Sequence, residues 1–236
     1  MAAVALVITG AACGEGGGGL GGRAREAGRQ RSAQARDAAR EAGLPEPVAD
    51  VIGDAAGAVG RTFTVTYDTG DGGRATLVQA PPRRRFDVTL PAGPTRTTMV
   101  NEQGSFACEQ RDGAWTCLPS QDPPPDIGPF APTALERTIG SLSTAQATYD
   151  IRVEPRPIAG IEARCLVAQR KPSAAGDPAL GERGVLCVAP SGAVVAIEQP
   201  GQLLTAVDYD DSVDENAFTL PGPLATTTTA PPASTP

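Results

Sequence analysis

Two of the five cysteines flank a turn signal, and together they predict how two strands pair. Cys108 and Cys117 stand at the two ends of a segment that has Asp112-Gly113 at its centre. Asp-Gly is favoured in two-residue type I′ hairpin turns, because both central residues need φ > 0. With that turn, Cys108 lies opposite Cys117 at a non-hydrogen-bonded pair, where Cα atoms approach to about 4.5 Å. A disulfide spans about 4.4–6.8 Å between Cα atoms, so the segment predicts a disulfide-closed β-hairpin.

Cys165 and Cys187 lie in two further strand-like apolar segments, residues 161–168 and 184–189. The loop between them, rich in Gly, Pro and Ala, is too long to fix their register. We predict a second, cross-strand disulfide between these two cysteines. A zinc site is the alternative, but the chain has no histidine and no Cys-x-x-Cys pair, which argues against bound metal. Two disulfides predict an oxidising compartment.

The fifth cysteine, Cys13, ends a short apolar run at residues 2–12. A membrane-spanning helix needs about 20 apolar residues, so the run is too short to span, but it matches the apolar part of a secretory signal. A cysteine directly after Gly-Ala-Ala resembles the lipobox of bacterial lipoproteins, in which the cysteine carries a diacylglyceryl group. The match is incomplete, because Gly10 replaces a branched aliphatic residue and no Lys or Arg precedes the run. The resemblance implies an extracytoplasmic protein anchored to the cell membrane by acyl chains on Cys13; a plain secretory signal is the alternative.

Composition argues against several classes of function. The net charge of −7 disfavours nucleic-acid binding. The chain has no histidine to act as a base near neutral pH, and no Gly-x-Ser-x-Gly motif or phosphate-cradling loop. We therefore expect neither an enzyme nor a bound cofactor. The acidic run at 208–215 lacks the spacing of a calcium loop and predicts a solvated edge, and Arg83 to Arg85 predict an ordinary polar strand.

The chain divides into four regions. Residues 1–13 are predicted to be the signal peptide and lipobox, and residues 223–236 a disordered Thr/Pro-rich tail. Residues 14–44 contain helix-forming residues but no apolar stripe, so we expect a flexible Gly- and Arg-rich tether that does not dock on a core. Its arginines are expected to be solvated; the alternative is that they rest on anionic headgroups. Residues 45–222 are predicted to form one folded domain.

Within that domain, two amphipathic helices are expected, at residues 47–59 and 133–145. Alternating apolar and polar residues predict six strands between the helices and five after the second. No helix separates consecutive strands in the manner of a parallel βαβ unit. The sequence therefore predicts an α+β, mainly β fold: one curved, open antiparallel sheet of about eleven strands with two helices on its concave face.

This order of elements resembles the LolA/LprG-type half-barrel. The resemblance covers residues 45–222 and includes a helix leading into Thr62-Phe-Thr-Val-Thr-Tyr and a terminal Asn216-Ala-Phe-Thr-Leu-Pro. Members of that family hold acyl chains between the sheet and its helices, so the resemblance implies a carrier or binder of lipids or acylated proteins. The candidate pocket residues are the inward side chains of the two helices: Val48, Ile52, Leu135, Ile139 and Leu142. In the alternative, these side chains plug the sheet, and the domain is a non-carrier interaction or sensor lipoprotein that engages an envelope protein partner.

Overall fold

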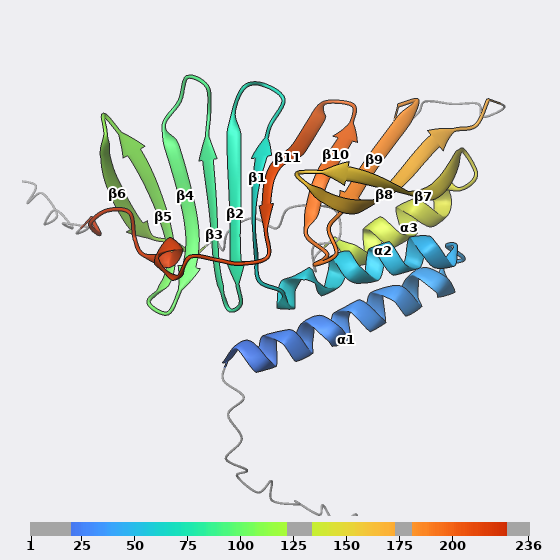
Figure 1. Ribbon diagram of the computed structural model, residues 1–236, viewed down its shortest axis with the longest axis horizontal. Helices are drawn as coiled ribbons and strands as arrows, with labels where there is room; N and C mark the ends of the chain where they lie inside the picture. Colours follow the sequence, from blue (N-terminus) through green and yellow to red (C-terminus); the bar gives the residue numbers. More distant parts are fainter. Residues whose placement is uncertain (1–19, 122–133, 173–180, 226–236) are drawn as a thin grey trace, which may run out of the picture.

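The protein is represented by a computed structural model, which describes residues 20–121, 134–172 and 181–225. Its centre is one open antiparallel sheet of eleven strands, built from two meanders (Figure 1). The first meander consists of β1 (Phe63–Asp68), β2 (Arg74–Ala80), β3 (Arg83–Thr89), β4 (Thr95–Asn101), β5 (Gly104–Arg111) and β6 (Ala114–Pro119). The second consists of β7 (Tyr149–Ile158), β8 (Ile161–Arg170), β9 (Arg183–Val188), β10 (Val194–Gln199) and β11 (Gln202–Asp210).

The two meanders join through the first and last strands. The strand order is β6-β5-β4-β3-β2-β1-β11-β10-β9-β8-β7, so β1 pairs with β11 in the middle of the sheet. This arrangement confirms the predicted mainly β, antiparallel fold class. The chain reaches it with local hairpins and one long connection, which carries the helix between β6 and β7.

Both predicted cysteine pairs are disulfides. Asp112 and Gly113 have φ of 51° and 80°, as a type I′ turn requires, and Cys108 lies opposite Cys117 between β5 and β6. Cys165 on β8 lies opposite Cys187 on β9 and is bonded to it. The predicted hairpin register is therefore confirmed.

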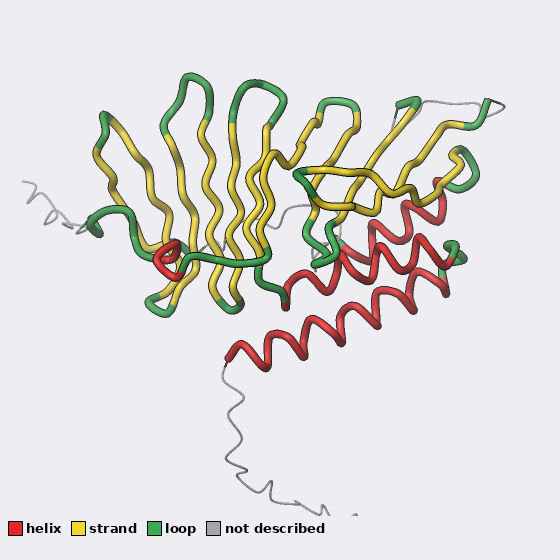
Figure 2. The backbone as a smooth tube through the Cα atoms, in the orientation of Figure 1, coloured by secondary structure: helices red, strands yellow, loops and turns green. Residues whose placement is uncertain are grey.

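The two predicted helices are present with shifted ends. They are α2 (Glu46–Gly57), which continues into the 3₁₀ turn η1 (Ala58–Gly60), and α3 (Leu135–Ala145). Pro47 lies in the first turn of α2, where the missing N–H costs no intrahelical hydrogen bond. Figure 2 shows the helices gathered beside one end of the sheet. The helices therefore pack on strands of the second meander, and the core that they form includes no residue of β1 to β6.

The prediction of a flexible tether is wrong for residues 20–41. These residues form α1 (Leu20–Glu41), which packs along α2 and buries Ala35 and Ala39. Small residues make this contact possible: a Cβ added to Gly28 would lie only 2.8 Å from the Cα of Gly60. A search for a stripe of large apolar side chains overlooks a face of Gly and Ala. The folded unit therefore includes α1 and does not begin at residue 45.

After β11, the chain turns back across the first meander as a strap, residues 211–225, which includes the 3₁₀ turn η2 (Glu215–Phe218). The Nδ2 of Asn101 donates a hydrogen bond to the carbonyl of Phe218 at 3.0 Å. The backbone of Cys117 accepts from the N–H of Ala225 at 2.9 Å and donates to the carbonyl of Pro223 at 3.1 Å. The predicted disordered tail is thus corrected at residues 223–225, which pair with β6; residues 226–236 lie outside the described part.

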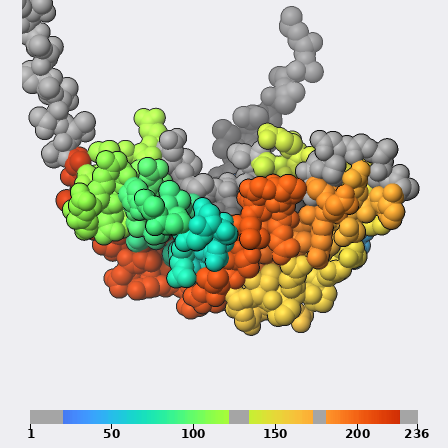
Figure 3. Space-filling view, turned by 90° about the horizontal axis from the view of Figure 1, so that it is seen from above, coloured from blue at the N-terminus to red at the C-terminus, as the bar shows by residue number. Residues whose placement is uncertain are grey.

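Strands β8, β9 and β10 are buried on both faces, so the fold has two main cores. The helix-side core joins α1, α2 and α3 to strand residues that include Leu166, Leu186, Val188, Val194 and Ile197. The second core joins β1 and β2 to the opposite side of β8 and β9, including the Cys165–Cys187 disulfide. In Figure 1 the β7–β8 hairpin crosses β9 and β10, and its end residue Ile158 joins this second core. Figure 3 shows the resulting arc of the sheet from above.

Candidate functional site

The structure brings the five candidate pocket residues together in one packed core. Val48, Ile52 and Ile139 are only 1 %, 0 % and 5 % exposed, in contact with apolar side chains of the sheet. Leu135 and Leu142 are partly buried against the same cluster. The candidate lining residues therefore belong to the core that holds the helices on the sheet.

Cys13 lies outside the described residues, so its lipidation stays a prediction. Among the residues that the structure describes, no helix is long and apolar enough to cross a membrane. The same residues contain no cluster of three or more His, Cys, Asp or Glu side chains suited to hold a metal ion. None of the residues predicted from the sequence therefore identifies a binding site on the described surface.

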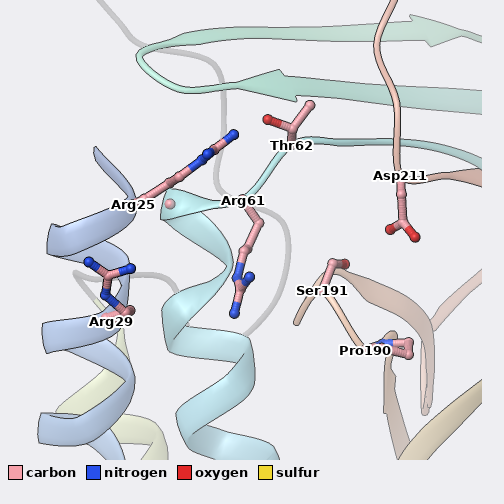
Figure 4. Close-up of a pocket in the computed structure, with 8 residues that line it drawn as sticks. Arg25, Arg29, Arg61, Thr62, Pro190, Ser191 and Asp211 are labelled. Carbon is pink, nitrogen blue, oxygen red and sulfur yellow. The ribbon is translucent and has the colours of Figure 1, made fainter. Parts of the chain in front are cut away.

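A cleft lies where α1 and the end of α2 approach the turn between β9 and β10 (Figure 4). Its volume is about 560 Å³. Three arginines, two hydroxyl residues and one carboxylate are among its lining residues, which are Arg25, Arg29, Gly60, Arg61, Thr62, Pro190, Ser191 and Asp211. We call this site the arginine cleft.

Close packing of α1 on η1 brings the arginines of the two segments to the same opening. A Cβ at Gly60 would lie 2.6 Å from the carbonyl oxygen of Ala24, so only glycine permits this approach without a shift. Arg61 follows η1 directly, and its backbone N–H donates to the carbonyl of Ala58 at 2.9 Å. In Figure 4, Arg25 extends from α1 towards Thr62, and Arg61 extends along α2 on the side that faces Ser191.

The opposite wall is a tight turn that packs against α2. Ser191 is fixed by its own turn, since its Oγ accepts a hydrogen bond from the N–H of Ala193 at 3.2 Å. Gly192 has φ of +84°, and a Cβ there would lie 2.0 Å from the carbonyl oxygen of Asp54 in α2. The wall of the arginine cleft is therefore positioned by backbone contact.

The charges in the cleft are unequally neutralised. Arg29 pairs with Glu26 on its own helix, whereas Arg25 and Arg61 form no ion pair with another described residue. The first turn of α1 contains no acidic residue, so the positive end of its dipole is not offset there. These features make the α1 side of the cleft electropositive in a chain of net charge −7.

Asp211 supplies the one negative side chain of the cleft. It accepts a hydrogen bond from the hydroxyl of Tyr209. Partial burial, together with this hydrogen bond to Asp211, raises the pKa of Tyr209 to about 12, so the tyrosine is neutral near pH 7. The cleft thus presents two guanidinium groups that have no ion-pair partner among the described residues. They lie with the Thr62 hydroxyl near one hydrogen-bonded carboxylate.

The neighbouring cavities show how different these two arginines are. One, of about 220 Å³, is lined in part by Arg36, which pairs with Asp50 at 2.8 Å. The other, of about 200 Å³, is lined in part by Arg83, which pairs with Glu215 at 2.7 Å. Arg25 also lines the cavity that contains Arg83, and Arg61 also lines the cavity that contains Arg36, so these two arginines stand where the arginine cleft adjoins its neighbours. Guanidinium groups bind phosphate or carboxylate oxygens with paired hydrogen bonds, so the chemistry on offer is anion binding.

The arginine cleft is not predictable from the sequence, because Arg25 and Arg29 lie in residues 14–44, which the sequence predicts to be a tether. The one indication in the sequence is the arginine excess of residues 14–44. By itself that excess predicts only solvated arginines or arginines that lie on anionic headgroups. Arg61 and Ser191 carried no signal of their own, because only the folded chain brings them near α1.

Comparison with known proteins identifies no family. No protein-family model matches the chain, and no curated protein matches it. Among solved structures, the chain is similar to an uncharacterized conserved protein from Thermus thermophilus, with a TM-score of 0.38 and 11 % identity over 72 % of this chain and 91 % of that one. It is also similar to PNGF-II, with a TM-score of 0.32 and 10 % identity over 70 % of this chain and 30 % of that one.

Proposed function

We propose that this chain is a lipid-anchored protein of the cell envelope whose half-barrel engages a protein partner and does not enclose an acyl chain. Export is supported by the signal-like segment that ends in Cys13 and by the two disulfides. Lipid anchoring at Cys13 is supported by the lipobox resemblance. The signal-like segment and the disulfides are independent features of the chain, and both favour an extracytoplasmic location.

The packing of the helix-side core carries the choice between the two roles. A ligand lying between helices and sheet would have to separate Ile52 and Ile139 from Leu186 and its neighbours. Each buried CH₂ group contributes about 0.8 kcal/mol, so inserting an acyl chain would sacrifice core burial as it gained ligand burial. A packed core therefore favours recognition at the surface of the domain over transport within it.

Replacing Ile139 with tryptophan tests this choice. If the core is packed, the larger side chain overpacks it, and the free energy of unfolding falls by about 1–3 kcal/mol. Ser141→Trp is the matched control, because Ser141 is exposed on the same helix, and there we expect a change within about 0.5 kcal/mol. Urea unfolding of both variants gives the stabilities, and native mass spectrometry of the parent protein shows whether lipid is retained.

The opposite result would support the carrier role implied by the LolA/LprG resemblance. In that case the parent protein would show reproducible adducts of acyl-lipid mass. Ile139→Trp would lose them while its stability stayed unchanged, because tryptophan would fill the space of the ligand. That combination would remove the proposed surface role.

The anchor is tested separately by Cys13→Ala. We expect this substitution to move the protein from the membrane fraction to the soluble fraction when the membranes are washed at high salt, without unfolding the domain. A single acyl chain binds only reversibly, with an association constant of about 10⁴ M⁻¹, whereas the several chains of a lipoprotein anchor stably. Cell fractionation followed by thermal unfolding provides the measurement. Retention of the Cys13→Ala protein in membranes at high salt would contradict lipidation at this residue.

A further inference from the structure

We infer that the arginine cleft binds the phosphate group of anionic phospholipid headgroups in the membrane to which the chain is anchored. The inference rests on the proposed anchor at Cys13, because the anchor places the cleft near the membrane. Binding of headgroups by the cleft can nevertheless be measured in a protein that has no anchor. The inference starts from the guanidinium groups of Arg25 and Arg61, which have no ion-pair partner in the described part of the chain and lie on two backbone segments held in contact.

The composition of the cleft fits a phosphodiester better than a bare cation or an apolar ligand. Arg25 and Arg61 provide planar forks of N–H donors for non-bridging phosphate oxygens. Thr62 adds a hydroxyl group that lines the same space and can donate to a phosphate or to the hydroxyls of a glycerol headgroup. The volume of about 560 Å³ is large enough for a headgroup. Asp211, on the far side, disfavours a second negative charge and so favours a singly charged phosphodiester.

The length of chain before α1 argues that the occupant is a lipid headgroup and not a dissolved phosphate. Seven peptide units separate Cys13 from Leu20, where α1 begins. At about 3.3–3.6 Å per residue, a fully extended chain spans at most roughly 25 Å over that distance. An acylated Cys13 lies at the membrane surface, so the first turns of α1 are held within that reach of the headgroups. Arg25 is in this part of α1, and Arg61 is held against it by the contact of Gly28 with Gly60.

The test uses the full chain with Cys13→Ala, isolated with both disulfides formed, so that no acyl anchor contributes. Co-sedimentation with phosphatidylglycerol vesicles is compared with phosphatidylcholine vesicles at the same ionic strength. We expect binding to phosphatidylglycerol vesicles and at least tenfold weaker binding to phosphatidylcholine. Hydrogen bonds to a charged group each contribute roughly tenfold or more to binding, so Arg25→Gln with Arg61→Gln should reduce binding at least about 100-fold.

Two further pairs of substitutions separate a shaped site from diffuse charge. Arg23→Gln with Arg31→Gln removes the same charge from exposed positions of α1 outside the cleft. General attraction to an anionic surface contributes about fivefold per arginine, so we expect a reduction of no more than about 30-fold. Arg25→Lys with Arg61→Lys keeps the charge but removes the guanidinium forks, and we expect an intermediate loss. Circular dichroism of each protein shows that it is folded before binding is compared.

An equal loss in the Arg23/Arg31 and Arg25/Arg61 variants would overturn the inference in favour of non-specific attraction. Binding of inorganic phosphate, detected by ³¹P NMR, without binding to phosphatidylglycerol vesicles would assign the cleft to a dissolved ligand and also overturn it. The cleft and the anchor are tested separately. If the protein does not bind vesicles but Cys13→Ala removes it from membranes, only the cleft inference is refuted. If the protein binds vesicles but Cys13→Ala does not change its fractionation, only the anchor is refuted.

Discussion

Gly192→Ala is expected to lower the free energy of unfolding by more than about 3 kcal/mol, enough to remove much of the stability of a typical domain. Two costs combine at this position. Gly192 has φ of +84°, where an L-residue is strained by roughly 1–2 kcal/mol. The added Cβ would also lie 2.0 Å from the backbone oxygen of Asp54, so one of the two backbone segments would have to shift. Relieving the overlap requires moving the β9–β10 turn off α2, which opens the helix-side core and one wall of the arginine cleft.

Gly201→Ala is the matched control for backbone strain alone. Gly201 lies in the β10–β11 turn with φ of +75°, and no atom lies within 4 Å of a Cβ placed there. We therefore expect a loss of only about 1–2 kcal/mol. Urea denaturation followed by circular dichroism measures both variants. Equal losses of stability at Gly192 and Gly201 would show that the β9–β10 turn does not contact α2 as closely as described.

The strands and hairpins were predictable because their signals are local. Alternation along a strand reports burial of one face, and an Asp-Gly turn between two cysteines leaves a single register. Cys165 and Cys187 were also paired correctly, although the register of β8 and β9 came only with the structure. The same locality explains why the order of the two meanders was recovered.

Contacts made by small residues were not predictable in this way. α1 presents Gly28, Ala35 and Ala39 to α2. On a hydrophobicity scale that gives most weight to large apolar side chains, this segment is polar. The stabilisation comes from close backbone approach and from ion pairs such as Arg36 with Asp50, both of which depend on the partner helix. Because one wall of the arginine cleft lies on α1, the cleft could not be predicted while residues 14–44 were expected to be a tether.

Other features depend on strands that meet only through the overall topology. The hydroxyl of Tyr67 on β1 donates to the carbonyl of Val194 on β10 at 2.7 Å, across β11. No local pattern connects these residues, since β1 meets β11 only when the two meanders close on each other. Burial raises the pKa of Tyr67, consistent with a hydroxyl that stays protonated in this second core.

Loss of the Cys165–Cys187 disulfide is the second large effect expected. The double substitution Cys165→Ala with Cys187→Ala should lower the free energy of unfolding by about 3–5 kcal/mol. The bond closes a sequence separation of 22 residues, for which the chain-entropy relation gives about 3.4 kcal/mol. Both sulfurs are also fully buried in the second core, so their removal leaves unfilled space beside Val167 and Val195.

The Cys108–Cys117 bond provides the comparison, because it closes a separation of only 9 residues. The same relation gives about 2.6 kcal/mol, and the type I′ turn already restrains this hairpin in the unfolded chain, which reduces the loss further. We therefore expect Cys108→Ala with Cys117→Ala to cost about 2 kcal/mol, clearly less than the other pair. Urea unfolding of the two double variants under identical conditions decides the order. A larger loss at the hairpin would place the more important cross-link in the first meander, and the second core would then be stable through the packing of β1 against β8 and β9 without its disulfide.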